Sequence, residues 1–487
     1  MPELAFALLA IPFFIAIMDW RKGFTLCVIT ALLQDPLRKL TPGQPVYFVV
    51  FTGVVFAAAW IGALMSRVAL SPNSIKGWRE QIGTPFGLFV LLVLAQAVHS
   101  FVRFFNPIVT GIGLMSYLAA VPAVVLAYQF AIRRGLGGMQ KWMWLYIVAA
   151  LLALSSVYLE YAGVDWRVLG EVGEGVAITN LGADTKGNSG FFRGSEVAAW
   201  HVATTACFMS MLFVGKRFTV PRIIVSVALV VFLLSVGILT GRRKMLVEVA
   251  IFFSAYLCLV AWFQSGAARL AVGAAVAGAI GFMLIIGLVP PDPGDSLSSV
   301  DRTTDSADRY QTYTNRGQTV FEDIPDRFWN LGVKSVADVI EFYGWFGMGL
   351  GTGSQGAQHF TSEATSGSAE AGLGKITLEL GVPGLALSGW LLIAFGRYVR
   401  RLLEVTTRSS QSHARFAYGL VAFLLANVAA FTVATQVYGD LFVLLLIGWT
   451  VGFLLAMPAL ALRAARPSPV PAKGTQRRVM SSPVRPI

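Results

Sequence analysis

The chain has 487 residues, of which 56% are hydrophobic and only 13% are charged, and its formal net charge is +12 at pH 7. Apolar runs recur along its whole length, which excludes an ordinary soluble protein and indicates a polytopic helical membrane protein. A β-barrel is disfavoured, because its strands would alternate apolar and polar residues. Much of the positive charge lies in short loops and in the tail, so nucleic-acid binding is not expected.

The predicted membrane spans are apolar runs close to the ~20 residues that cross the hydrocarbon core of a bilayer. Their approximate bounds are 3–19, 23–36, 46–66, 84–105, 108–131, 142–163, 193–214, 220–240, 244–263, 268–289, 375–397, 414–435 and 438–462. The second run is short and contains Gln34 and Asp35. The sequence therefore predicts an all-α polytopic membrane protein with roughly 12–13 transmembrane helices. The first run lacks a basic n-region and a cleavage site, so it is predicted to be a retained span.

Polar stretches divide the chain into four predicted parts. Residues 1–289 form the first part of a transmembrane bundle, and residues 290–374 form one large extracytoplasmic loop with an amphipathic helix. Residues 375–462 complete the bundle, and residues 463–487 form a disordered basic tail.

The predicted topology follows from the short basic loops, among them "AIRRGLGGMQK", "GKRFTVPR" and "GRYVRR". Such loops normally face the cytoplasm. The long polar stretches then lie on the extracytoplasmic side, with the N-terminus outside and the C-terminus inside.

The short stretch "TGRRKM", from Thr240 to Met245, separates two predicted spans and carries Arg242, Arg243 and Lys244. On the predicted topology these cations lie outside, against the positive-inside rule, and such a violation indicates a functional site. The alternatives are a span count that is wrong by one, or cations that merely touch lipid phosphates.

Other polar residues are expected on the same side. Arg193 and Glu196 begin a predicted span, and His201 lies deeper in it. A snorkelling anchor is the alternative for Arg193, and a satisfied interior histidine is the alternative for His201. Arg309 and Arg327 lie in the long loop, and we count them as candidate substrate-binding residues. A solvated loop capped by an amphipathic helix is the alternative for this region.

The end of the long loop is rich in glycine, which allows close backbone approach and mobility. Its "GMGLGTG" stretch lacks a following GK[ST], so nucleotide binding is rejected. Glu370, just before the next span, is a candidate general base, although it could simply mark the water boundary. Cys27, Cys207 and Cys258 lie in apolar runs without metal-ligand spacing, so neither zinc nor disulfides are expected.

Arginines at the end of a span match one kind of substrate. Guanidinium groups bind diphosphates through forked, charge-assisted hydrogen bonds, and a lipid-linked diphosphate sugar presents its phosphates at headgroup depth. Transfer of the sugar needs positive charge on the leaving diphosphate and a base for the acceptor hydroxyl. No metal or other cofactor is expected, because arginines can supply the neutralising charge.

The order of these features resembles the O-antigen ligase and polymerase superfamily of bacterial envelope glycan enzymes. The similar features are "GFFRG" before a span, the "TGRRK" hairpin, a long late loop with an Arg-x-Trp helix that runs into "GMGLG", and "ITLELGVPGL" at the loop-to-span junction. They cover roughly residues 110–460. The resemblance implies a multi-pass enzyme of the bacterial inner membrane, with its active site on the periplasmic face and its C-terminus in the cytoplasm.

The resemblance also implies roles for single arginines. Arg242 or Arg243 matches the hairpin arginine that the family uses on the lipid diphosphate. Arg193 matches the arginine before its span, and Arg327 matches the loop arginine.

The family often has a histidine about nine residues before the junction glutamate, which is Glu379 in this sequence. Glu370 stands at that position here. This departure leaves either Glu370 or His359, from the glycine-rich stretch, as the catalytic base.

The leading hypothesis is a polymerase that transfers the growing glycan from its polyprenyl diphosphate carrier to the next lipid-linked repeat unit, in exopolysaccharide or O-antigen synthesis. A ligase that transfers glycan to lipid A core or to a protein would use the same donor site. A membrane transporter or lipid-linked sugar flippase, or an assembly partner without an active site, remains an alternative. Expected partners are the polyprenyl diphosphate-linked oligosaccharide, membrane lipid, and a chain-length regulator or envelope export complex.

Overall fold

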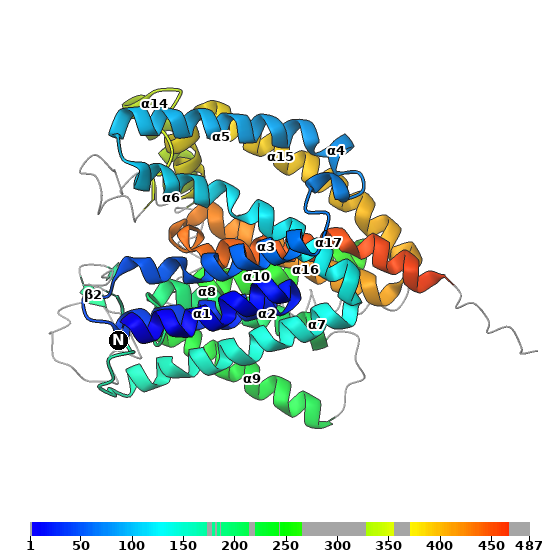
Figure 1. Cartoon of the computed structure of the whole chain (residues 1–487), viewed down its shortest axis with the longest axis horizontal. Coiled ribbons are helices and arrows are strands. Elements are labelled where there is room, and N and C mark those ends of the chain that lie inside the picture. Colours follow the sequence, from blue (N-terminus) through cyan, green and yellow to red (C-terminus); the bar gives the residue numbers. More distant parts are fainter. Residues whose placement is uncertain are drawn as a thin grey trace, which may run out of the picture.

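The computed structural model describes residues 2–172, 178–180, 183–185, 187–213, 220–242, 244–264, 328–354 and 371–466. These residues are almost entirely helical (Figure 1). One small hairpin pairs strand β1 (Ile178–Asn180) antiparallel with strand β2 (Ala183–Thr185).

Long apolar helices dominate the described part of the chain, and this confirms an all-α polytopic membrane protein. Within the described ranges, seven helical stretches are long and apolar enough to cross a membrane. They are Val46–Met65, Gly83–Phe104, Pro107–Tyr161, Met245–Phe263, Gly372–Ser409, Gln411–Val433 and Leu441–Ala465. The predicted span 268–289 lies outside the described residues, as do 290–327 of the long loop and the tail beyond 466.

The first half of the chain forms helices close to the predicted spans. Their bounds are α1 (Pro2–Met18), α2 (Trp20–Leu40), η1 (Val46–Val50), α3 (Phe51–Met65), η2 (Pro72–Ser74), α4 (Trp78–Gln81), α5 (Gly83–Phe104), α6 (Pro107–Leu118), α7 (Ala120–Tyr161), α8 (Ser195–Phe213), α9 (Val220–Leu239) and α10 (Lys244–Phe263). The predicted spans 108–131 and 142–163 are joined through the long element α7, which is broken at Gly135 (φ 67°, ψ −174°). The basic "AIRRGLGGMQK" loop therefore lies within a broken helix.

The later elements are η3 (Phe328–Val333), α14 (Lys334–Tyr343), α15 (Gly372–Ser409), α16 (Gln411–Val433), η6 (Gln436–Gly439) and α17 (Leu441–Ala465). The segment of the predicted amphipathic helix forms η3 and α14. Val339 is fully buried and packs against Met348 and Leu378, whereas Phe342 is 74% exposed. Helix α15 continues past the predicted span 375–397 into its basic last turns.

Helix α17 lies at the centre of the bundle, and 83% of the residues in its most apolar 18-residue stretch are buried. It packs along α7, where Gly448 and Gly452 allow close contact: a Cβ added to Gly452 would lie 2.3 Å from the carbonyl oxygen of Val124. Small residues at such contacts let transmembrane helices approach closely. By contrast, α5 and α15 pack on each other at one side of the bundle (Figure 1). In each of them, only 33% of the residues in the most apolar 18-residue stretch are buried.

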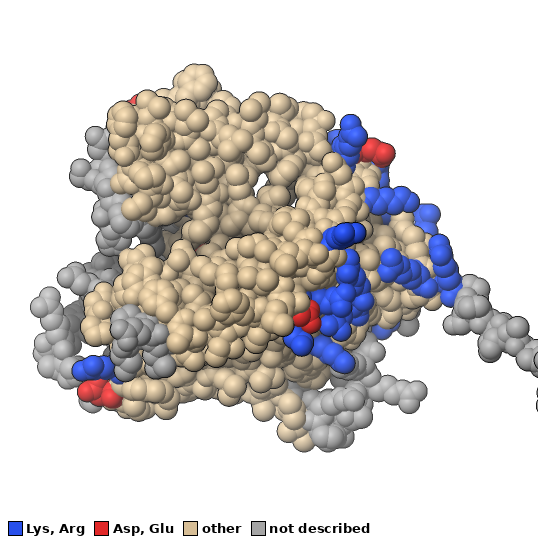
Figure 2. Space-filling model, in the orientation of Figure 1, with Lys and Arg blue, Asp and Glu red and all other residues tan. Residues whose placement is uncertain are grey.

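The two ends of the bundle differ in charge. Basic side chains gather at the end where α4 lies and where α15 and α17 finish (Figure 2). Residues of these elements include Arg79, Arg400, Arg401, Arg408 and Arg463. The opposite end holds the N-terminus, the last turns of α2, α5 and α7, and the first turns of α8 and α17.

Candidate functional site

The candidate site lies at the end of the bundle opposite the basic side chains. We call it the arginine–carboxylate cluster and define it as Asp35, Arg193, Glu196, Arg242 and Asp440. These residues come from α2, from the segment before α8, from α8, from the α9–α10 hairpin and from the residue before α17. Two of the predicted site residues, Arg193 and Arg242, are thus brought to the same end of the molecule.

Arg193 joins α2 to the start of α17. Its Nη2 lies 3.2 Å from Oδ2 of Asp440, and the two side chains are 23% and 4% exposed. Its backbone N–H donates to Oδ2 of Asp35 at 3.0 Å. Asp440 also caps α17, because its Oδ1 accepts from the backbone N–H groups of Phe442 at 2.7 Å and Val443 at 3.2 Å. The guanidinium is therefore held in a fixed place while part of it stays accessible.

Arg242 lies on the first turn of α8. Its Nε donates to Oγ of Ser195 at 3.0 Å, and its Nη2 lies 3.0 Å from Oε1 of Glu196. The Nη2 donor makes no aligned hydrogen bond within the described part of the chain. The hairpin turns through Gly241, which has a φ of 68°, and its Thr240 Oγ1 accepts from the backbone N–H of Arg242 at 3.4 Å. The predicted hairpin is confirmed, because α9 ends at Leu239 and α10 begins at Lys244.

Both arginines already have carboxylate partners, which sequence reasoning did not foresee. A bound anion would share each guanidinium with its carboxylate, because arginine offers five N–H donors. Such pairing holds the guanidinium donors in position before a ligand arrives, but the negative charge of the carboxylates opposes the binding of an anion.

The loop before Arg193 is fixed from two sides. The Nζ of Lys39 donates to the carbonyl oxygens of Gly190 at 2.8 Å and Phe192 at 2.5 Å. Oε2 of Glu160 accepts from the backbone N–H of Ser189 at 2.9 Å and of Gly190 at 2.7 Å. Gly190 has a φ of 57°, and an added Cβ would lie 2.3 Å from Oγ of Ser156. Only glycine fits this turn.

Lys39 lies past the predicted span 23–36, in the last turn of α2. Burial lowers the pKa of its ammonium group to about 8, against the opposing effect of the Asp35, Glu160 and Glu171 carboxylates. Sequence reasoning missed Lys39, Asp35, Glu160 and Asp440 as partners of the site. The available signal was their position, since each stands at the boundary of an apolar run.

A second polar network connects α8, α10 and α16. Asn427 donates through Nδ2 to Oε1 of Glu248 at 3.2 Å and accepts at Oδ1 from Nε1 of Trp200 at 2.9 Å. Tyr438 donates through its hydroxyl to the carbonyl oxygen of Asn427 at 2.9 Å. Glu248 is 3% exposed and lies one turn into α10. The network ties the hairpin helix α10 to the segment that precedes Asp440.

His201 is a satisfied interior histidine, which confirms the structural alternative for this residue. It is 2% exposed, and its Nδ1 lies 2.7 Å from the hydroxyl of Tyr146. The rings of Phe192 and Phe442 stack on it.

The glycine-rich segment after α14 lies across α5 and α15. Its Met348 N–H donates to the carbonyl oxygen of Leu378 at 2.7 Å, and the Ser100 hydroxyl donates to the carbonyl oxygen of Leu350 at 2.7 Å. Gly349 has a φ of 100°, and an added Cβ would lie 2.9 Å from the Cα of Ser100. The predicted close backbone approach is thus confirmed.

The same segment is anchored to the buried Glu379 of α15. Oε1 of Glu379 accepts from the backbone N–H of Gly353 at 3.0 Å, and α15 is broken two residues later at Gly381 (φ 71°, ψ −174°). Oε2 of Glu379 has no hydrogen-bond partner among the described residues. The junction glutamate therefore fixes the segment that leads to 355–370.

Several predicted site residues lie outside the described residues. They are Arg243, Arg309, Arg327, His359 and Glu370, together with the side chain of Lys244. Lys244 begins α10, and Arg327 immediately precedes η3 in the sequence. Within the described ranges, no group of three or more His, Cys, Asp or Glu side chains is arranged to hold a metal ion.

In comparisons with known proteins, no protein-family model matches the chain and no curated protein matches it. The resemblance to the O-antigen ligase and polymerase superfamily therefore remains a prediction.

Proposed function

We propose that this protein is a glycan polymerase, which transfers a growing glycan from a polyprenyl diphosphate carrier to an acceptor sugar hydroxyl on another lipid-linked repeat unit. The observation that carries the proposal is that Arg193 and Arg242 both lie at the start of α8, each beside a carboxylate. This is the end of the bundle opposite the one where basic side chains gather in Figure 2.

The proposed orientation places the basic end in the cytoplasm, as the positive-inside rule requires. Helix α17 then enters from the extracytoplasmic side at Asp440 and finishes in the cytoplasm near Arg463. The arginine–carboxylate cluster lies on the extracytoplasmic face of the proposed inner membrane. There it would meet a diphosphate at headgroup depth.

The proposed donor site uses the remaining guanidinium donors of Arg193 and Arg242 on the diphosphate. These charges persist at any physiological pH. They favour the transition state, because negative charge grows on the leaving diphosphate as its bond to the sugar breaks. Arg243, Lys244, Arg309 and Arg327 are proposed to add to the same positive field.

The proposed reaction is a displacement at the anomeric carbon of the donor sugar. The acceptor hydroxyl oxygen forms the new glycosidic bond, its proton passes to Glu370 or His359, and the polyprenyl diphosphate leaves with the electron pair of the broken C–O bond. The glycine-rich segment anchored by Glu379 runs directly into 355–370, which contains both candidate bases. Its fixed end supports a role in placing them.

The test is polymerisation by the purified full-length protein. It is incubated with lipid-diphosphate-linked repeat units from its host, and the products are resolved by size. Wild-type protein should give a ladder, whereas Arg242→Gln and Arg193→Gln should lower its yield at least tenfold, because each removes charge from the leaving group. Arg400→Gln is the matched control, because it breaks the Arg400–Glu404 ion pair at the exposed basic end, where the side chains are 68% and 40% exposed.

Two results would count against the proposal. A ladder of equal yield in all variants would show that Arg193 and Arg242 do not contribute to the reaction. Absence of any ladder from folded wild-type protein would disfavour a polymerase, and transfer to added lipid A core would then identify a ligase.

A further inference from the structure

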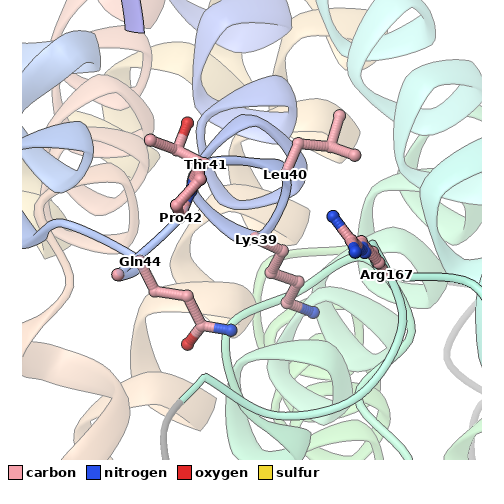
Figure 3. A pocket seen from close by; sticks show the side chains of 7 residues that line it. Lys39, Leu40, Thr41, Pro42, Gln44 and Arg167 are labelled. Carbon is pink, nitrogen blue, oxygen red and sulfur yellow. The ribbon is translucent and has the colours of Figure 1, made fainter. Parts of the chain in front are cut away.

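A depression of about 290 Å³ lies at the end of α2. It is lined by Lys39, Leu40, Thr41, Pro42, Gly43, Gln44 and Arg167. Two of its lining residues are charged, both are cations, and they come from distant parts of the chain. Figure 3 shows the Lys39 amine between Gln44 and Arg167. No carboxylate is among its lining residues.

Lys39 keeps one donor for this space. Its ammonium group has three N–H donors, and two are used on the carbonyl oxygens of Gly190 and Phe192. Three carboxylates lie near Lys39. Those of Asp35 and Glu160 accept hydrogen bonds from backbone N–H groups of the segment 189–193, and Oε1 of Glu171 accepts from the backbone N–H of Ser195 at 3.0 Å. These acids are therefore engaged with another part of the structure.

Arg167 is exposed, and it makes no ion pair or hydrogen bond with any other described residue. The carbonyl groups at the end of a helix attract cations, which accounts for Lys39 and for Arg38, whose Nε donates to the carbonyl oxygen of Gln44 at 2.9 Å. This explanation does not extend to Arg167, which belongs to the loop after α7.

Exposed apolar residues adjoin both walls of the depression. Val164 and Trp166, beside Arg167, are 45% and 49% exposed. Val46 and Tyr47, which follow the turn at Gln44, are 59% and 40% exposed. Tryptophan and tyrosine gather where the membrane meets water, so these rims place the two cations at headgroup depth.

We propose that this depression binds the phosphate group of a membrane lipid, through Arg167 and the remaining donor of Lys39. It is a separate site from the arginine–carboxylate cluster, although Lys39 connects the two through the loop before Arg193. The phosphate belongs either to a phospholipid headgroup or to the polyprenyl carrier of a lipid-linked glycan. Both sources present the same oxyanion at the same depth.

The experiment measures lipid binding by native mass spectrometry of the full-length protein released from detergent. The probes are phosphatidylglycerol against diacylglycerol, and polyprenyl diphosphate against polyprenol, so the first lipid of each pair carries phosphate and the second does not. Arg167→Gln should weaken binding of a phosphate-bearing probe roughly fivefold, since one cation near a membrane surface contributes about 1 kcal/mol. Arg167→Lys should retain part of the affinity.

The matched control is Arg103→Gln, which removes another exposed arginine, in the last turn of α5 at the same end of the bundle. It should leave binding unchanged. Equal losses in Arg103→Gln and Arg167→Gln would overturn the proposal, as would equal binding of lipids with and without phosphate. The probe whose binding depends on Arg167 identifies the source of the phosphate. Because binding is read without turnover, this test is independent of the proposed polymerase activity.

Discussion

Replacement of Asp440 by asparagine tests whether the buried ion pair with Arg193 stabilises the bundle. The Asp440 side chain is 4% exposed and serves two groups: it caps α17 through Oδ1 and pairs with Arg193 through Oδ2. Asparagine keeps an oxygen for the cap and removes the charge. Breaking a fully buried pair costs about 3–5 kcal/mol. Because Arg193 is 23% exposed and water can replace part of the contact, we expect a loss of about 2 kcal/mol.

The measurement is a double-mutant cycle of Asp440→Asn and Arg193→Gln, with unfolding in mixed micelles followed by circular dichroism. The loss in the double variant should be smaller than the sum of the single losses by about 2 kcal/mol, which is the coupling energy of the pair. The same cycle on Arg400 and Glu404, an exposed pair at 3.2 Å, should give less than about 0.5 kcal/mol. Equal coupling energies in the two cycles would show that burial does not strengthen the Arg193–Asp440 pair.

Two further predictions concern close backbone contacts. Gly349→Ala should lower the free energy of unfolding by more than about 1 kcal/mol, because φ is 100° and the new Cβ would lie 2.9 Å from the Cα of Ser100. Gly452→Ala should cost a similar amount by forcing α17 away from α7, because its new Cβ would lie 2.3 Å from the carbonyl oxygen of Val124. The control is Gly389→Ala, in α15, where an added Cβ would have open space around it. This variant should be neutral or more stable by up to about 1 kcal/mol. Thermal unfolding compares all three variants, and a loss of stability at Gly389 as large as at the other two positions would contradict both predictions.

Much of the fold follows from the sequence because a bilayer imposes one simple condition. A span needs about 20 apolar residues, and runs such as 84–105 and 438–462 correspond closely to α5 (Gly83–Phe104) and α17 (Leu441–Ala465). The break in α7 falls in the loop predicted between the spans 108–131 and 142–163, whereas the break in α15 lies inside the predicted span 375–397 and was not predicted. Gly135 and Gly381 interrupt α7 and α15 at single residues, and a lone glycine also occurs in many unbroken helices.

The candidate site was predictable in position but not in its partners. The position of Arg193 and Arg242 at the ends of apolar runs follows from the order of residues alone, because cations are expelled from hydrocarbon to its boundary. The pairing of Arg193 with Asp440 and of Arg242 with Glu196 arises only when the helices pack. Pairing across the bundle depends on which helices are neighbours and on their depth and rotation. These are set by side-chain packing between helices, which leaves no periodic signal in the chain.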